Sequence, residues 1–207
     1  VWLSYTDKNI LEDINLDIYQ GDFLLITGPN GGGKTSLLRT ILRLQSPTKG
    51  RISFFRQGEP VSSLDMGYLP QKNSIDSRFP ITVEEVVASG LMGNTQKGNT
   101  KFDSKKEIDE MLDLMGITAL RNKPIGVLSG GQLQRSLFGR ALISKPEMLI
   151  LDEPASYIDR QFGNRMFEIL RDLSSNGTTI MMVSHEIEPF ITLSNRNLYI
   201  NHILGDR

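Results

Sequence analysis

The sequence predicts an α/β protein built on a mostly parallel sheet, and two observations support this prediction. Strand-like apolar runs recur along the chain, at residues 23–26, 51–55, 66–69, 148–151 and 179–183. Segments with helical periodicity follow several of them, at residues 35–44, 133–144 and 161–173. Strands that alternate with helices imply right-handed crossovers, and these bring the strands together in parallel.

The first part of the chain predicts two strands and a helix. Apolar and polar residues alternate at 14–18, which predicts a half-buried antiparallel strand. The continuous apolar run at 23–26 is expected of a strand buried on both faces. The helix predicted at 35–44 is expected to stop before Pro47 and Gly50, two residues that do not continue a helix.

The middle of the chain, from about residue 72 to 127, loses the strand pattern. Thr82 is expected to cap a helix that contains Val83, Val86, Val87 and Leu91. Residues 93–106 are rich in glycine, asparagine and lysine and predict a surface loop, and a second helix is expected at 108–115.

These patterns predict a single domain over residues 1–207 with an insertion. Residues of about 1–71 and 128–207 are expected to form the α/β core, with an antiparallel β subdomain on its N-terminal side. Residues of about 72–127 are expected to form a mainly helical sublobe, a name kept below for this range.

Composition excludes several kinds of function. Lysine and arginine number 23 against 24 acidic residues, a balance that argues against a nucleic-acid binder. The absence of cysteine and the presence of only two histidines exclude disulfides, thiolate metal sites and histidine-rich metal sites. The sequence shows neither an apolar run of the ~18–20 residues that span a bilayer nor a signal peptide. We therefore expect a soluble chain in a cytosol-like compartment, one whose start at Val1 leaves room for a missing N-terminus.

A glycine-rich loop carries the strongest chemical signal. It follows the predicted strand at 23–26, opens the predicted helix at 35–44, and consists of Gly28, Pro29, Asn30, Gly31, Gly32, Gly33, Lys34 and Thr35, with Ser36 next. Glycines let successive backbone N–H groups face one concavity, and the helix N-terminus adds partial positive charge there. Lys34 is expected to reach the β- and γ-phosphates, and the Thr35 hydroxyl to bind magnesium. The loop by itself predicts only the binding of nucleotide phosphates.

Two acids end the predicted strand at 148–151. Ligands of an open parallel sheet lie at the carboxyl ends of its strands, so Asp152 and Glu153 are expected beside the phosphate loop. Adjacent residues leave a strand on opposite sides and need not share a role. Asp152 suits magnesium binding, and Glu153 suits orienting or deprotonating a water molecule. A polar turn without function is the alternative, and the phosphate loop upstream favours the catalytic interpretation.

A second glycine motif precedes the predicted helix at 133–144. It consists of Leu128, Ser129, Gly130, Gly131 and Gln132, in which Ser129 is a good helix N-cap. The two glycines leave the backbone open to close approach, so this is another helix start suited to an anion. Taken alone the motif is moderate support only, because Ser-Gly-Gly is an ordinary loop sequence.

This motif, some twenty residues before Asp152-Glu153-Pro154, resembles the signature of the ABC-type ATPases. Nearly the whole chain fits that family's order of parts. Tyr5 matches the aromatic residue that stacks on adenine, and Gln71 matches the glutamine that links magnesium to the helical sublobe. Asp159 matches the acid of the loop after the acidic strand, and His185 matches the histidine that contacts the γ-phosphate.

The resemblance implies a P-loop NTPase core that binds ATP and Mg²⁺ and hydrolyses the ATP. Glu153, His185 and Gln71 would then be catalytic, and Thr35, Gln71 and Asp152 would hold the metal. It also implies that two copies close head to tail, so that ATP on one phosphate loop is covered by the partner's second glycine motif. The nucleotide would be contacted by Tyr5, the phosphate loop from Gly28 to Ser36, Asp159, Ser129, Gly130, Gly131 and Gln132.

The chain departs from the family pattern at two places. Tyr157-Ile158 stands where the family usually has Ala-Leu, and Phe138-Gly139-Arg140 stands where Ala-Arg is usual. Neither difference removes a catalytic group, although Tyr157 would alter packing across the expected dimer.

Residues 67–76 and 79–83 are similar to the ATPase subunits that import zinc, manganese or iron chelates. This similarity implies a peripheral subunit on the cytoplasmic face of a membrane, bound to a permease and indirectly to a substrate-binding protein. With so few metal ligands, the subunit itself is not expected to touch the metal. The alternative is a soluble ABC ATPase that acts as a regulatory or mechanical switch. Exposure of Phe79 or Leu91 on the sublobe would favour the permease-bound alternative.

Overall fold

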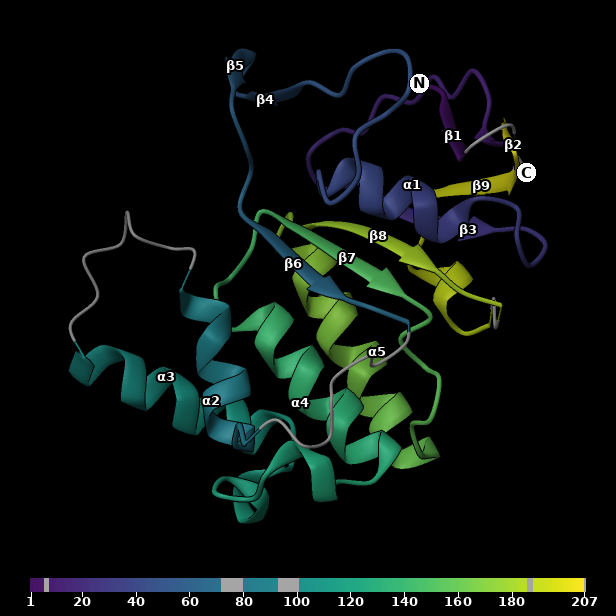
Figure 1. Cartoon of the computed structure of the whole chain (residues 1–207). Helices are drawn as coiled ribbons and strands as arrows, with labels where there is room; N and C mark the ends of the chain where they lie inside the picture. The colour runs from purple at the N-terminus through teal and green to yellow at the C-terminus, as the bar shows by residue number, and fades with distance from the viewer. Residues whose placement is uncertain (6–7, 72–79, 93–100, 186–187, 207) are drawn as a thin grey trace.

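The computed structural model describes residues 1–5, 8–71, 80–92, 101–185 and 188–206 (Figure 1). Its centre is a six-stranded sheet with the order β10-β9-β3-β8-β7-β6. All neighbours in this sheet are parallel except β10, which runs antiparallel to β9. The strands are β3 (Phe23–Thr27), β6 (Met66–Leu69), β7 (Met148–Asp152), β8 (Thr179–Val183), β9 (Arg196–Asn201) and β10 (Ile203–Asp206). The predicted α/β fold with a mostly parallel sheet is confirmed.

Both faces of the sheet are covered, as the unbroken apolar runs predict. On β3, Leu24 and Ile26 enter one apolar cluster, while Phe23 and Leu25 enter the other. Figure 1 shows α1 (Lys34–Ile41) with β1 (Leu3–Tyr5) and β2 (Lys8–Leu11) on the first face, and helices α2 to α5 on the second. The alternation of side chains along a strand therefore divides the core into two layers.

Two small antiparallel pairs flank the sheet, β1 with β2 and β4 (Phe54–Arg56) with β5 (Glu59–Val61). The strand predicted at 51–55 thus begins three residues later and pairs in a hairpin. The strand predicted at 14–18 is wrong, since this segment is not part of any strand in the described chain. Its apolar side chains still face the core beside α1, so the alternation predicted burial correctly and pairing incorrectly.

Helix α1 ends at Ile41 rather than at residue 44. Arg43 has a left-handed backbone with φ of 56°, which stops the helix before Pro47 is reached. The side chain of Leu44 is consequently on the surface instead of in the apolar stripe of a longer helix.

The described part of the sublobe is helical. It contains α2 (Val83–Ala88), α3 (Lys101–Leu114) and the 3-10 turns η1 (Ser89–Leu91), η3 (Thr118–Leu120) and η4 (Ile125–Val127). Thr82 caps α2 with a reciprocal Glu85 contact, as its position predicted. Residues 101–106, predicted as loop, belong to α3, while the rest of that loop lies outside the described residues.

Of the two apolar side chains whose exposure on the sublobe would favour the permease-bound alternative, Phe79 lies outside the described residues. Leu91 is partly buried against the larger core cluster. Met92, the next residue, is exposed instead, with 81% of its surface accessible.

Helices α4 (Gly130–Leu142) and α5 (Arg160–Ser175) complete the layer beneath the sheet, and the short turn η5 (Phe190–Thr192) precedes β9. The departure at Gly139 has a packing cause. A Cβ atom there would lie 3.3 Å from Cγ of Met111 in α3 and 3.5 Å from Cγ2 of Val87 in α2, so glycine lets both helices pack closely onto α4. The neighbouring Phe138 is fully buried and meets the ring of Phe162 edge to face.

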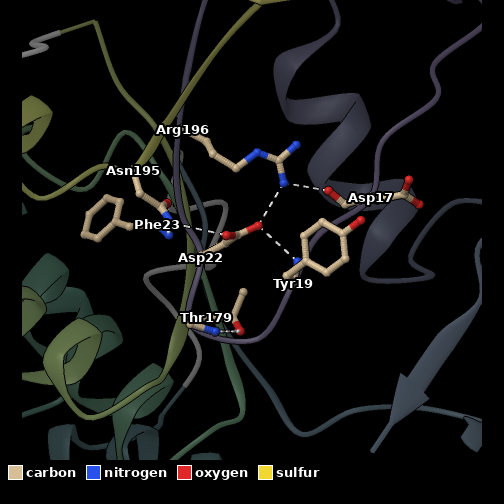
Figure 2. Close-up of polar contacts among 8 residues, drawn as sticks. Asp17, Tyr19, Asp22, Phe23, Thr179, Asn195 and Arg196 are labelled. Carbon is tan, nitrogen blue, oxygen red and sulfur yellow. Dashed lines mark hydrogen bonds and ion pairs between the residues drawn. The ribbon is translucent and has the colours of Figure 1, made fainter. Parts of the chain in front are cut away.

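The amino edge of the sheet is held by a polar network around Asp22 (Figure 2). Its carboxylate accepts hydrogen bonds from the Tyr19 N–H at 3.0 Å, the Asn195 amide at 3.2 Å and the Arg196 guanidinium at 2.8 Å. Arg196 also donates to the Asp17 carbonyl at 2.6 Å. The network joins the entry to β3 with the start of β9.

Among the described residues, no helix combines the length and the apolar character that a membrane crossing requires.

Candidate functional site

The phosphate loop lies between β3 and α1, where the sequence motif predicts it. Gly28, Gly31 and Gly33 have φ values of 144°, 78° and 98°, which side chains rarely adopt. Space is also short, because a Cβ atom at Gly28 would lie 2.0 Å from the carbonyl oxygen of Ile200. The glycines are therefore required both by the curl of the loop and by what packs behind it.

Lys34 opens α1 and is 6% exposed. Its ammonium group donates to the carbonyls of Gly28 at 2.8 Å and Pro29 at 2.9 Å, across the mouth of the loop. Burial lowers the pKa of Lys34, and the carboxylates of Glu153 and Asp152 oppose that shift. A fixed cation therefore lies at the concave side of the loop.

Asp152 ends β7 and is 1% exposed. Neither of its carboxylate oxygens has a hydrogen-bond partner within 3.5 Å in the part of the chain that the structure describes. Burial raises the pKa of Asp152, while the nearby Thr35 hydroxyl, Arg39 and Lys34 oppose this shift. A buried carboxylate with no hydrogen-bond partner within 3.5 Å among the described residues, next to the first turn of α1, fits a site for a divalent cation with oxygen ligands.

Glu153 and His185 meet at the same carboxyl edge. The Glu153 N–H donates to the Val183 carbonyl at 2.9 Å, which fixes the loop after β7 to the end of β8. Its carboxylate lies 3.1 Å from Nε2 of His185. Glu153 has a left-handed φ of 52°, a strained conformation of the kind that concentrates at functional sites.

Gln71 and Tyr5 do not take part in the hydrogen bonds and ion pairs identified among the described residues for Lys34, Asp152, Glu153 or His185. Gln71 follows β6, the neighbour of β7, and so it also leaves the carboxyl edge of the sheet with an exposed side chain. Tyr5 ends β1 with half of its surface accessible, and its hydroxyl donates to Oε1 of Gln45 at 2.6 Å. The accessible ring suits stacking, whereas the hydroxyl already has a partner.

The second glycine motif begins α4 as predicted. Ser129 is the N-cap, its side chain accepts from the Gln132 N–H at 3.3 Å, and its own N–H donates to the Gln132 side chain at 3.0 Å. A Cβ atom at Gly131 would lie 2.8 Å from the Tyr157 carbonyl oxygen. Tyr157, 78% exposed and with φ of 68°, therefore packs its backbone against this motif.

Asp159 caps α5, a role that the resemblance did not imply. Its carboxylate accepts from the Phe162 N–H at 2.9 Å and forms an ion pair with Arg135 of α4. The Phe162 N–H is the main cause that lowers the pKa of Asp159, and Arg135 adds to it. The Arg135 guanidinium also lies 4.5 Å from the Phe162 ring centroid, so α4 and α5 are joined beside the second glycine motif.

Sequence reasoning missed the turn between β9 and β10. The Ile200 carbonyl packs against Gly28 and Gly32, and the His202 N–H donates to the Gly32 carbonyl at 2.9 Å. No motif marks this contact. The available signal was the left-handed preference of the Asn201-His202 pair between two apolar runs, which is typical of a hairpin turn.

Comparison with known proteins agrees with this arrangement. The ABC transporter family matches residues 11–156. The chain is 40% identical over 200 residues to the "Probable metal transport system ATP-binding protein" of Chlamydia pneumoniae, covering 95% of this chain and 81% of that one. It is 37% identical over 208 residues to "Zinc uptake system ATP-binding protein ZurA" of Listeria monocytogenes, covering 97% and 78%.

Among solved structures, the dimeric bacterial ABC transporter cassette MJ0796 superposes with a TM-score of 0.85 at 25% identity. The match covers 100% of this chain and 96% of that one. The phosphate loop, the acidic end of β7 and the capped second glycine motif thus occur together in a chain that matches the family over most of its length. The chain belongs to the ABC transporter family.

Proposed function

We propose that this protein is the ATP-hydrolysing subunit of a transporter that takes up metal ions. The observation that carries the ATPase part is Asp152, a buried carboxylate beside Thr35 and Lys34 with no hydrogen-bond partner within 3.5 Å among the described residues. A buried charge without a partner is costly, and a bound cation offsets that cost. Such a carboxylate next to a phosphate-binding loop favours a site for a nucleotide and a divalent metal.

In this proposal the phosphate loop from Gly28 to Ser36 cradles the ATP phosphates, and the Lys34 ammonium exchanges its carbonyl partners for phosphate oxygens. Asp152, Thr35 and Gln71 are the residues that would hold Mg²⁺. When bound, Mg²⁺ would neutralise charge on the β- and γ-phosphate oxygens. Tyr5 would stack on the adenine ring.

Glu153 would orient the attacking water and accept its proton, because its carboxylate lies at the carboxyl edge beside the loop. His185, 3.1 Å from that carboxylate, would hold Glu153 in place and donate to the γ-phosphate. The hydrogen-bonded backbone of Glu153 keeps this acid at a fixed position relative to β8. In this proposal Glu153 acts on the water molecule and His185 acts on the γ-phosphate.

Two copies of the chain would complete each site. Ser129, Gly130, Gly131 and Gln132 begin a thirteen-residue helix whose N-terminal N–H groups are suited to a phosphate. A head-to-tail dimer would place this motif over the partner's nucleotide, with Asp159 and Tyr157 at the same surface. A similar cassette has been solved as a dimer, which supports this arrangement.

The metal-uptake part of the proposal comes from the relatives, which are named as metal transport and zinc uptake proteins. Their names favour a subunit at the cytoplasmic face of a membrane, bound to a permease and served by a substrate-binding protein. The alternative of a soluble switch is not favoured by any of them. Met92, exposed on the sublobe, is a candidate contact for the permease.

The test of the ATPase is Glu153→Gln. Turnover should fall by about 10²–10⁴-fold, the range for loss of a general base, while ATP still binds. The variant should also accumulate as an ATP-bound dimer by size-exclusion chromatography with light scattering. Glu168→Gln, an exposed acid on α5 that pairs with Arg171, is the matched control and should hydrolyse ATP normally. Unchanged hydrolysis in Glu153→Gln would remove Glu153 from its role.

The transport part has a separate test. Cells that lack the gene should lose uptake of radioactive zinc, manganese or chelated iron, and the wild-type gene should restore it. The Glu153→Gln gene should not restore uptake, although its product is made in equal amount. Normal uptake of all three metals in the deleted strain would overturn the metal assignment and leave the ATPase untouched.

A further inference from the structure

We propose that His202 is a positioning residue of the phosphate loop, an inference that rests on the proposed binding of ATP. His202 lies in the turn between β9 and β10, far along the chain from the loop. Its backbone N–H holds the Gly32 carbonyl and thereby turns the Gly33 N–H toward the bound phosphates. The residue does not touch the nucleotide and acts through the loop backbone.

His202 is held from three directions. Its N–H donates to the Gly32 carbonyl at 2.9 Å, and its own carbonyl accepts from the Glu12 N–H at 2.7 Å. Its ring Nδ1 lies 3.2 Å from the carbonyl oxygen of Ile10. With φ of 64°, the residue also adopts the left-handed conformation that points its N–H at the loop. The turn therefore connects β2 to the phosphate loop.

The hydrogen bond to the Gly32 carbonyl has a consequence for the N–H at the other side of the same peptide group. In a planar trans peptide, the C=O of one residue and the N–H of the following residue point in opposite directions. The Gly32–Gly33 bond is trans, so a Gly32 carbonyl aimed at His202 turns the Gly33 N–H away from the turn. In the described part of the chain this N–H has no acceptor.

The neighbouring groups of the loop are already used. The Gly32 N–H donates to the Pro29 carbonyl at 3.1 Å, and the Gly33 carbonyl accepts from the Leu37 N–H at 2.8 Å. Within the ranges that the structure describes, the Gly33 N–H is thus a free donor, in a loop whose adjacent backbone groups are fixed. A donor held in advance binds an anion better than one that must reorient, because no ordering is needed on binding.

Packing behind the loop leaves little room for another arrangement. A Cβ atom at Gly32 would lie 2.8 Å from the Ile200 carbonyl oxygen, and one at Gly33 would lie 2.7 Å from the Ile10 carbonyl oxygen. The backbone of the loop is therefore wedged between β2 and the β9–β10 turn. A change in the conformation of His202 must move the Gly32–Gly33 peptide.

Three substitutions at His202 separate its conformation from its side chain. Asn and Gly tolerate the left-handed region, whereas β-branched Val does not. His202→Val should raise the Kd for ATP by about tenfold. The reason is that the free-energy cost of a left-handed conformation for valine corresponds to a change of about that size in a dissociation constant. His202→Asn should remain within about twofold of the wild type, and His202→Gly should lie between them. Maximal turnover at saturating ATP should change less than the KM.

Gln57→Val is the matched control for strain alone. Gln57 also has a left-handed φ, 54°, but it lies in the exposed β4–β5 turn. This variant should lose a similar amount of thermal stability and bind ATP like the wild type. Where His202→Val does not fold, His202→Ala, with a smaller left-handed cost, should change the Kd in the same direction.

A direct readout is available from the glycines. Combined labelling with carbonyl-¹³C and amide-¹⁵N glycine restricts an HNCO spectrum to Gly-Gly pairs, which occur only at 31–33 and 130–131. Of the three amides observed, that of Gly33 should shift most when ATP with magnesium binds the wild type, and less in His202→Val.

The proposal is overturned if folded His202→Val binds ATP as tightly as the wild type, or if Gln57→Val weakens binding equally. An unchanged ATP-induced shift of the Gly33 amide in His202→Val would also overturn it. A wild-type protein that does not bind ATP would instead refute the proposed function itself, so the two failures are distinguishable.

Discussion

A buried aspartate lies at each end of the strands of the central sheet, one at the amino edge and one at the carboxyl edge. The two differ in whether the chain supplies hydrogen-bond partners for the carboxylate. At the amino edge, Asp22 is 7% exposed and accepts hydrogen bonds from Tyr19, Asn195 and Arg196. At the carboxyl edge, Asp152 is 1% exposed, and its carboxylate has no hydrogen-bond partner within 3.5 Å among the described residues. Their pKa values move apart, since donors from Tyr19 and Arg196 lower that of Asp22 against the effect of burial, and burial raises that of Asp152.

The difference separates what holds the fold from what serves a ligand. A buried carboxylate whose partners are all in the chain contributes to the free energy of unfolding. A buried carboxylate whose partners are missing lowers that free energy and persists because a ligand supplies them. Glu153, whose backbone is left-handed, lies next to Asp152 at the carboxyl edge. Four predictions test this contrast.

Asp152→Asn should give the largest effect. ATP turnover should fall by about 10²–10³-fold, since a charge aimed at the reacting centre is lost. In the absence of nucleotide and magnesium, the free energy of unfolding should rise by about 1 kcal/mol because a neutral amide is cheaper to bury. Urea denaturation and steady-state hydrolysis measure the two quantities. A variant that is both inactive and less stable would contradict the contrast.

Asp22→Asn should act in the other direction. The free energy of unfolding should fall by about 2 kcal/mol, because the Arg196 guanidinium loses the carboxylate that neutralises it. Hydrolysis by the folded variant at 25 °C should stay within about twofold of the wild type, since the network lies at the edge away from the phosphate loop. A large loss of turnover with unchanged stability would show that the two edges are not separate in function.

The stabilisation by Asp22 should depend on pH with a known sign. Its pKa is lowered in the folded protein, so its stabilising effect is present above the unfolded value of about 4 and lost as pH falls through the folded pKa. The difference in unfolding free energy between wild type and Asp22→Asn should therefore be constant from pH 8 to about 5 and shrink below about pH 4. A difference that stays constant from pH 8 down to pH 3 would contradict the ionic origin.

Glu147→Gln should give the smallest effect. Glu147 also lies at the amino edge, where it accepts from Arg56 at 2.8 and 2.6 Å, yet both side chains are more than a third exposed. The free energy of unfolding should fall by about 0.5 kcal/mol or less, since solvent screens exposed pairs. Thermal denaturation of the wild type and Glu147→Gln in low and high salt measures this difference in stability. A loss as large as that of Asp22→Asn would mean that burial does not distinguish the two acids.

Much of this architecture could be predicted because its signals are local. Four of the central strands and the caps at Thr82 and Ser129 depend on residues within a few positions of one another. The phosphate loop and the acidic end of β7 are likewise contiguous motifs, and parallel topology brings them to one edge. Membership of the ABC family followed from the order of these motifs and was confirmed by comparison.

The remainder depends on contacts between distant segments. Residues 14–18 alternate like a strand, but pairing requires a partner edge that their pattern does not specify. The capping of α5 by Asp159 with Arg135, and the contact of His202 with Gly32, join segments that no local pattern relates. The roles of the individual site residues stay predictions, among them the metal ligands and the partner's contribution from Ser129.

The division of the core into two layers also fixes which acid serves which purpose. Leu149 and Leu151 of β7 face one cluster, while Met148 and Ile150 face the other. The position of a residue along β7 therefore decides which face of the sheet its side chain lies on. A single residue inserted in β7 would move every later side chain to the opposite face, so Asp152 would take the orientation that Glu153 has now. Substitutions of similar size in β7 therefore keep Asp152 in place, whereas insertions or deletions of an odd number of residues do not.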